Sequence, residues 1–425
     1  MFITLTRDLC LLVATMLQMA AIKSTSVETN CRHITNPGVL TPKQRGCVNM
    51  KPVNFAPDIP NQSTLTKQVG AVRSVLIGLL VVVSMLLSLS LASFAAPLLP
   101  VPVSTSPSNK DVNPYGVLFV LLSGGIPVGT LRHGDILVSN FNNSANVMGT
   151  GTTIVDIRNG AQVTPPFYTA TPGNEGVDLA LGQLGNFIIV GNVPVNGTKA
   201  GPGALTVLNS NGKVVNSITD TSIDGPWGLA ITSTGSSATL YVSNLLNGTV
   251  WRLDGTTSTT SGFKLNSETQ IGGNFGTMIN FPTAANGPAG LAYDSAHDIL
   301  YVASEVNNKI YAISMASTRG TTNTRGTVVY SDPTHLHGPT GLLLLPNGDL
   351  LTANDDGVNV ATPPTNPSAL IEFTSKGKFV TQLSIDPTPG GAFGIGLAKN
   401  GNQTLLAYVD DNQVTLSVLS LFFQS

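Results

Sequence analysis

Charged residues and cysteines are both scarce in this chain. Only 10% of the 425 residues are charged, and the three cysteines, Cys10, Cys31 and Cys47, all precede residue 66. No disulfide and no thiolate can therefore serve the rest of the sequence. A disordered chain would carry more charge and fewer apolar residues than the 42% found here, so most of the chain is expected to fold.

Positive charge is also in short supply over most of the chain. Residues 97–425 hold 13 basic and 20 acidic residues, for a net charge of −7. Because an acidic surface repels phosphate backbones, we expect no nucleic acid partner. The sequence also lacks a nucleophile elbow, a zinc-protease helix motif, a phosphate loop and a dinucleotide fingerprint.

Long apolar runs are confined to the first hundred residues. Residues 9–22 form a run too short to cross a bilayer comfortably, but residues 75–92 are uncharged and mostly apolar, with Lys67 and Arg73 before them and small residues after them. This order is typical of a secretory signal peptide, and the length also suits an uncleaved transmembrane anchor. Both alternatives predict export to the periplasm, the cell envelope or the medium, with this segment as the only contact with a membrane.

The position of the signal divides the chain into four parts. Signals normally lie at the start of a protein, so residues 1–66 are interpreted as a poorly structured extension, or as sequence upstream of the true start. Residues 67–96 are the signal peptide or anchor helix. Residues 97–112 are rich in Pro, Ser and Thr and are predicted to be a linker. Residues 113–425 form the folded domain.

Glycine is abundant, with 44 copies, and much of it belongs to a repeat. A Gly followed by apolar residues, usually shortly after a Pro, recurs six times, as in GPWGLA at 225–230, GPAGLA at 287–292 and GPTGLL at 338–343. The anchoring glycines are Gly116, Gly176, Gly228, Gly290, Gly341 and Gly394. Each unit continues with an apolar run ending in Asn or an acid, such as LYVSN at 240–244, and then a further run after a turn.

Short apolar runs separated by turn residues and repeated six times predict an all-β fold, a six-bladed β-propeller preceded by the N-terminal hydrophobic helix. Small residues are required where the innermost strands crowd together near the axis. The last unit shows only three strands, so the missing edge is expected from residues around Val117 or from the segment just before it. We expect a monomer.

The repeat units resemble those of NHL-repeat propellers, most closely at residues 225–254 and 287–313, and they also look like YVTN-type surface propellers. The resemblance covers about residues 113–421. It implies a propeller of the bacterial cell envelope. It implies little about activity, because this scaffold carries enzymes, binding modules and structural proteins.

The candidate site lies in the turns that follow the second strand of each unit. Those turns share one propeller face with the turns that enter the first strand, and their oxygen-bearing side chains suit a hard cation such as Ca²⁺ or a polyhydroxyl ligand. The metal candidates are Glu305, Asp410 and Asp411, and the ligand candidates are Asn244, Asn354 and Asp355. The alternative is that Asn and Asp are there simply as turn formers.

Three further residues are candidates for ligand binding. His335 and His337 lie in the loop entering the fifth unit. They are interpreted as metal ligands, as an acid–base pair, or as loop residues that are hydrogen-bonded to carbonyl groups. Trp227 would either stack on a sugar ring or wedge between blades.

The function favoured by these observations is an extracytoplasmic binding or interaction module. Its partner would be a protein, a small molecule or a carbohydrate at one propeller face. The chain is also similar to the gluconolactonase and regucalcin propellers. That likeness implies a metal-dependent hydrolase or lyase of the lactonase type as the alternative, with Glu175, Asn244, Asn354 and Asp410 as the positions to consider for a divalent metal.

Overall fold

The computed structural model describes residues 101–125, 127–281, 284–355 and 368–421. The extension at 1–66 and the signal or anchor at 67–96 lie outside the described residues. Among those that are described there is no α-helix, only the short 3₁₀ helix η1 (Ser123–Gly125). No helix in this part of the chain is long and apolar enough to cross a membrane.

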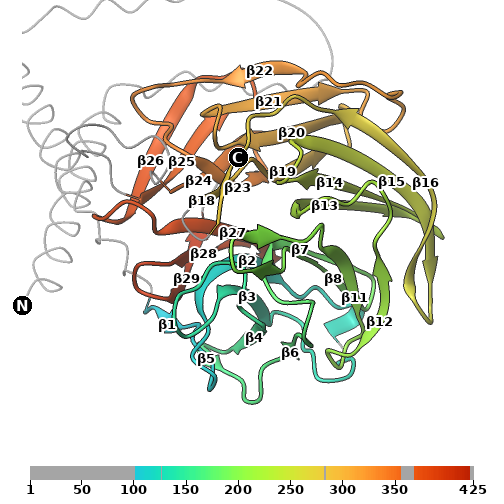
Figure 1. Ribbon diagram of the computed structural model, residues 1–425. Helices are drawn as coiled ribbons and strands as arrows, with labels where there is room; N and C mark the ends of the chain where they lie inside the picture. The colour runs from blue at the N-terminus through green and yellow to red at the C-terminus, as the bar shows by residue number, and fades with distance from the viewer. Residues whose placement is uncertain (1–100, 126, 282–283, 356–367, 422–425) are drawn as a thin grey trace, which may run out of the picture. The chain divides into compact units, whose positions relative to one another are not determined.

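The described residues form six antiparallel sheets arranged around a common axis (Figure 1). Five are four-stranded and one has a fifth strand, β6, beside β4. The innermost strand of each sheet contacts the innermost strands of its two neighbours, in the order β2, β7, β13, β19, β23, β27 and back to β2. The ring therefore closes, and the fold is a six-bladed β-propeller, as the repeat predicts.

The strands of the blades run from the axis outwards. Blades 1 to 3 comprise β2 (Val112–Phe119), β3 (Ile136–Asn142), β4 (Thr153–Arg158), β5 (Ala161–Gln162) and β6 (Tyr168–Thr169); β7 (Val177–Leu184), β8 (Phe187–Asn192), β11 (Ala204–Leu208) and β12 (Val214–Ile218); and β13 (Pro226–Thr234), β14 (Ser237–Asn244), β15 (Thr249–Ser258) and β16 (Gly262–Gly272).

Blades 4 to 6 comprise β19 (Pro288–Asp294), β20 (Ile299–Ser304), β21 (Lys309–Ser314) and β22 (Thr327–Tyr330); β23 (Pro339–Leu344), β24 (Asp349–Asn354), β25 (Ser368–Thr374) and β26 (Phe379–Asp386); and β27 (Ala392–Asn400), β28 (Gln403–Asp410), β29 (Thr415–Leu421) and β1 (Val103–Ser104). Two small hairpins, β9 (Val195–Asn196) with β10 (Lys199–Ala200) and β17 (Met278–Asn280) with β18 (Ala284–Asn286), extend the loops.

The sixth blade is completed by the start of the described chain. Val103 and Ser104 pair with Leu416 and Thr415, so β1 is the outer strand of a blade whose other strands come from the C-terminal end. The segment before residue 113 thus supplies the missing edge, which was one of the two alternatives. The propeller consequently includes residues from within the stretch expected to be a linker.

Every inner strand carries a register irregularity at the same place. The irregularity lies near the start of the strand and ends at an aliphatic residue in five blades and at Gly228 in blade 3. The bounding pairs are Pro114 and Val117, Val177 and Leu181, Pro226 and Gly228, Pro288 and Leu291, Pro339 and Leu342, and Ala392 and Ile395. This alignment corrects the predicted anchor of blade 2. Gly176 precedes β7 and corresponds to Gly225, whereas Ala180 occupies the anchor position.

The remaining anchors pack against the backbone of the next blade. A Cβ added to Gly228 would lie 2.0 Å from the carbonyl oxygen of Ala289, and one added to Gly394 would lie 1.8 Å from that of Tyr115. Between the blades, apolar side chains of the broad sheet faces form the hydrophobic clusters that hold the ring together. The crowding at the axis is as expected from the sequence.

Candidate functional site

The residue that follows the second strand holds the same backbone position in five blades. Its N–H donates to the carbonyl of the glycine that precedes the inner strand, for Val193, Leu245, Glu305, Asp355 and Asp411 at 2.9, 2.7, 3.1, 3.2 and 2.9 Å. In blade 1 the position belongs to Phe141, because Asn140 pairs with Pro114 as Asn244 does with Pro226. Blades 1 to 3 thus place apolar side chains here, and blades 4 to 6 place carboxyl groups.

Glu305 and Asp355 form a buried pair of carboxyl groups in the acidic half of this ring. Their exposed fractions are 2% and 3%. Burial raises the pKa of Glu305 well above its ordinary value, and the negative charge of Asp355 raises it further. Asn286 donates an amide hydrogen to Glu305 Oε1 at 2.5 Å, which lowers that pKa in part. A proton is therefore retained in this pair at higher pH than a surface carboxyl would allow.

Asp411 and Asp410 continue the acidic half into blade 6. Burial, more than the charge of Asp410, raises the pKa of Asp411 to about 7, although Asn113 donates to its Oδ2 at 2.5 Å. Burial and then the charge of Asp386 raise the pKa of Asp410 to about 6. Both aspartates are thus more readily protonated than ordinary carboxyl groups.

These acids are grouped in pairs. Within the described residues, no three His, Cys, Asp or Glu side chains gather so that they could hold one ion. Glu305 interacts with Asp355 through a side-chain hydrogen bond and through charge, whereas Asp410 interacts in the same way with Asp386. Glu305, Asp410 and Asp411 are therefore not gathered as three acids around one point.

The predicted amide residues tie loops to strands. Asn244 donates to the carbonyl of Ser222 at 2.8 Å and accepts the N–H of Asp224 at 3.1 Å. Asn354 donates to the carbonyl of His335 at 3.2 Å and accepts the N–H of His337. Both side chains are buried. Each amide is hydrogen-bonded to backbone groups of the loop that enters its own blade, and such bonds are typical of Asn in turns.

The two histidines belong to that same loop in blade 5. His335 Nδ1 lies 2.7 Å from Asp332 Oδ2, and its ring stacks on Phe379 with centroids 3.9 Å apart. His337 is buried, and its Nε2 lies 3.3 Å from the carbonyl oxygen of Thr334. The rings are held by different partners, and the loop is anchored by both.

Trp227 is part of an aromatic plug on the axis, defined here as Tyr115, Phe141, Trp227 and Phe393. Tyr115 stacks on Phe393 with centroids 4.3 Å apart, and Trp227 meets Tyr115 and Phe141 edge-on at 5.4 and 5.0 Å. Trp227 is only 1% exposed, so its ring offers no open face to a sugar. Burial, followed by the charges of Glu305, Asp411, Asp355 and Asp178, raises the pKa of Tyr115.

Beyond the plug, towards the ends of the inner strands, the axis holds a cavity of about 320 Å³ whose wall combines aliphatic side chains with polar backbone atoms. All six blades contribute to its wall, through Val117, Leu181, Leu229, Leu291, Leu342 and Ile395 among others. These are the aliphatic residues on which the inner-strand irregularities end or, in blade 3, the one that follows it. The cavity is therefore at the propeller face opposite the Asn- and Asp-rich turns. We call it the axial cavity.

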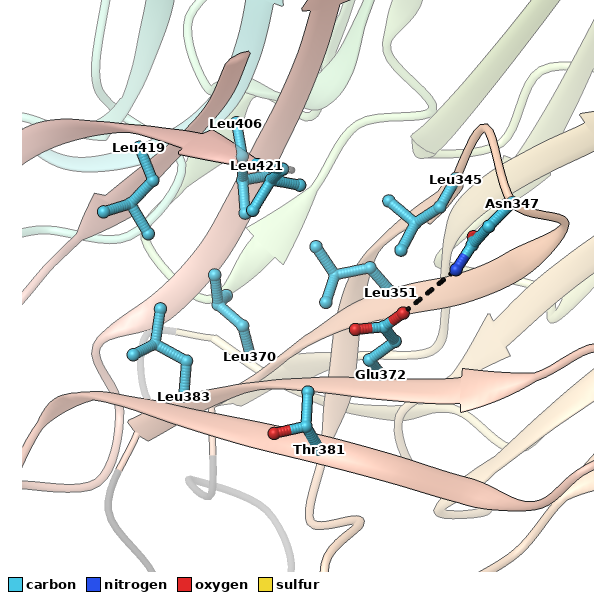
Figure 2. A pocket seen from close by; sticks show the side chains of 10 residues that line it. All are labelled: Leu345, Asn347, Leu351, Leu370, Glu372, Thr381, Leu383, Leu406, Leu419 and Leu421. Carbon is cyan, nitrogen blue, oxygen red and sulfur yellow. Dashed lines mark hydrogen bonds between the residues drawn. The ribbon is translucent and has the colours of Figure 1, made fainter. Parts of the chain in front are cut away.

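A second apolar pocket, of about 330 Å³, lies between blades 5 and 6 (Figure 2). Its wall is formed mostly by leucines, with Leu351 and Leu370 facing Leu406 and Leu421, and with Asn347 donating to Glu372 at 3.4 Å. Burial raises the pKa of Glu372. A ligand in this pocket would contact two blades, whereas a ligand in the axial cavity would contact all six.

Sequence reasoning selected the polar face and missed the axial cavity. The signal was present in the repeat itself, since each unit has an aliphatic residue directly after its anchor position. Only the assembled ring shows that six of them surround one space.

The fold defines the class of this protein as a six-bladed β-propeller. No protein-family model matches the sequence, and no curated protein matches it. Among solved structures it is similar to a gluconolactonase from Xanthomonas campestris, with 14% identity over 74% of this chain and 88% of that chain and a TM-score of 0.44.

Two further structures are similar at the same level. A nidogen/laminin complex chain matches at 13% identity, over 68% of this chain and 85% of that one, with a TM-score of 0.41. A luciferin-regenerating enzyme matches at 10% identity, over 77% and 96%, with a TM-score of 0.40. Values this low carry no argument about activity, and the blade number rests on the sheet topology described above.

Proposed function

We propose that this protein is an extracytoplasmic binding module that holds an apolar ligand in the axial cavity. The observation that carries the proposal is the wall of that cavity, to which every blade contributes aliphatic side chains. Its volume of about 320 Å³ is at the lower end of the range for small-molecule sites. Leu121, two residues after the inner strand of blade 1, is 49% exposed and lines the same space, so the cavity reaches the surface there.

Support also comes from what the polar face does. The amides and histidines predicted there are bonded to loops, and the aromatic plug fills the axis beneath them. A ligand of moderate size would find space at the opposite end of the axis. The partner expected at one propeller face is thus a small apolar molecule.

The test is the binding of 1-decanol to the purified full-length chain, measured by isothermal titration calorimetry. We expect saturable binding that is lost in Leu229→Phe and in Leu397→Phe, because the larger ring fills the cavity from either side. The matched control is Leu383→Phe, which changes the pocket between blades 5 and 6 and should bind decanol as the wild type does. Absence of binding to the wild type, or loss only in Leu383→Phe, would contradict the proposal.

Export belongs to the same proposal. The basic, apolar and small-residue order over residues 67–96 supports either a cleaved signal or an anchor, with residues 1–66 as an extension ahead of it. Mass spectrometry of the native amino terminus distinguishes the two. A mature chain starting near residue 97 supports cleavage, and peptides from residues 24–60 would show that the extension is made and retained.

Membership of the NHL-like or YVTN-type propellers is likewise proposed. It is supported by the coincidence of the repeat with the blades, since residues 225–254 cover β13, β14 and most of β15, and residues 287–313 cover β19, β20 and most of β21. The lactonase-type alternative has one observation in its favour, the buried carboxyl pair of Glu305 and Asp355 near the axis.

A further inference from the structure

A basic pocket adjoins the axial cavity at the junction of blades 6 and 1. Its volume is about 540 Å³, and it shares two wall residues, Phe119 and Leu121, with the axial cavity. Because both spaces are bounded by these two side chains, at and just after the end of β2, the two spaces are neighbours. A single ligand could therefore occupy an apolar and a polar compartment together.

The polar compartment is lined by positive side chains. These are Arg132, Arg158 and Lys399. The wall also includes the carboxyl group of Asp135 and the ring of His133, whose Nδ1 lies 3.1 Å from both the nitrogen and the oxygen of Leu122. The domain has 13 basic against 20 acidic residues, so three basic residues and one acidic residue at a single pocket are a local excess of positive charge in an acidic molecule. Such a concentration favours an anionic ligand.

The three cations differ in how far they are already neutralised. Arg158 donates two hydrogen bonds to Asp135, from Nε to Oδ1 at 2.8 Å and from Nη2 to Oδ2 at 2.7 Å. Its Nη2 also lies 2.7 Å from Asp156 Oδ2. Arg132 is exposed and donates through Nη1 to the carbonyl of Leu131 at 3.1 Å. In the part of the chain that the structure describes, neither Arg132 nor exposed Lys399 forms an ion pair.

We infer that the ligand is a single-chain amphipathic anion, with its alkyl chain in the axial cavity and its anionic head between Arg132 and Lys399. Arg158, held by two aspartates, forms a fixed wall behind the head. The axial cavity has room for about ten water-sized groups, which suits one medium-length chain and excludes a two-chain lipid. This inference rests on the proposed function and adds the charge of the ligand to it.

The experiment compares decanoate and decyl phosphate with 1-decanol on the purified full-length chain by isothermal titration calorimetry. The three ligands share the same alkyl chain and differ in the head. We expect at least one of the two anions to bind about tenfold or more tightly than decanol. The double variant Arg132→Gln/Lys399→Gln should lose that advantage and bind decanol as before.

The matched control is Lys376→Gln/Lys378→Gln, which removes two exposed basic residues from the turn before β26 and should leave all three affinities unchanged. Equal affinity for decanol and both anions, or an advantage that survives Arg132→Gln/Lys399→Gln, would overturn the inference while leaving the proposed function intact. If none of the three ligands binds, the proposed function fails as well. Thermal unfolding of each variant establishes that it is folded.

Discussion

At the scale of single residues, the anchoring glycines define how closely the inner strands can approach. Gly228 and Gly394 have carbonyl oxygens of the next blade where a Cβ would stand, so contact there is backbone on backbone. The requirement is one of space and not of unusual backbone angles. A substitution at these positions acts on the whole ring, because the crowded neighbour belongs to another blade.

Replacing Gly394 by Ala is therefore expected to destabilise the propeller by about 1–3 kcal/mol, the usual cost of overpacking. The added methyl would lie 1.8 Å from the carbonyl oxygen of Tyr115. Urea unfolding followed by tryptophan fluorescence measures the change. Gly320→Ala is the control, since no atom lies within 4 Å of its added Cβ. Equal stability of the two variants would show that the inner strands separate without cost.

The buried aspartate of blade 6 should make stability depend on pH. The pKa of Asp411 is raised from 3.8 to about 7, chiefly by burial, so the folded chain keeps a proton that the unfolded chain loses. Between about pH 4 and pH 7 the folded state binds more protons, and the free energy of unfolding therefore falls as pH rises.

Asp411→Asn should reduce this dependence, because an amide can still accept the hydrogen bond from Asn113 and cannot ionise. Thermal midpoints of the wild type and the variant, measured from pH 4 to pH 8, provide the test. We expect the variant to gain stability relative to the wild type as pH rises. A constant difference across that range would mean that Asp411 titrates at the same pH in the folded and unfolded chain.

At the scale of elements, the ring closes through a very short strand. β1 is two residues long, yet Thr105 just after it binds both neighbouring blades. The Thr105 N–H donates to the carbonyl of Val414 at 3.0 Å, and its own carbonyl accepts from Asn140 of blade 1 at 3.0 Å. The closing segment therefore joins blade 6 to blade 1.

Removal of this segment should loosen the whole domain. A chain that starts at residue 106 leaves the outer edge of β29 unpaired, whereas one that starts at residue 97 retains β1. We expect the shorter chain to melt several degrees lower in differential scanning calorimetry, because lost edge pairing lowers stability and each kcal/mol shifts the midpoint by a few degrees. Identical midpoints would assign no closing role to β1.

At the scale of the whole molecule, the two propeller faces differ in chemistry. One face carries the Asn- and Asp-rich turns and half a ring of carboxyl groups, and the other opens onto the axial cavity and the basic pocket. The carboxyl groups of the first face are held by amides and by one another. The axial cavity and the basic pocket, which have room for a ligand, are on the second face.

The metal content of the purified chain separates the two functions considered. After dialysis without chelator, elemental mass spectrometry is expected to show less than one divalent ion per chain, because the predicted metal residues do not converge on one point. EDTA should leave the thermal midpoint unchanged. One tightly held ion per chain would instead favour the lactonase-type alternative, and variants of Glu305, Asn354 and Asp410 would then identify its ligands.

The sequence by itself determined the number of blades, the strands within them and the need for small residues at the axis. Those features are local, because alternating strands and turn residues encode a blade within a stretch such as residues 225–254. The same locality explains the error in blade 2. Gly176 has the right neighbours for an anchor, and only pairing with β8 shows that a longer irregularity moves the anchor to Ala180.

Only the tertiary structure decided where open space and charge come together. Each of the six blades contributes an aliphatic residue to the wall of the axial cavity. The basic pocket is lined by Arg132 of blade 1 and Lys399 of blade 6, which are neighbours because the ring closes between these two blades. Residues so far apart in sequence have no shared local pattern. Their proximity follows from ring closure, which brings the first and last blades side by side and turns six separate strand ends into one wall.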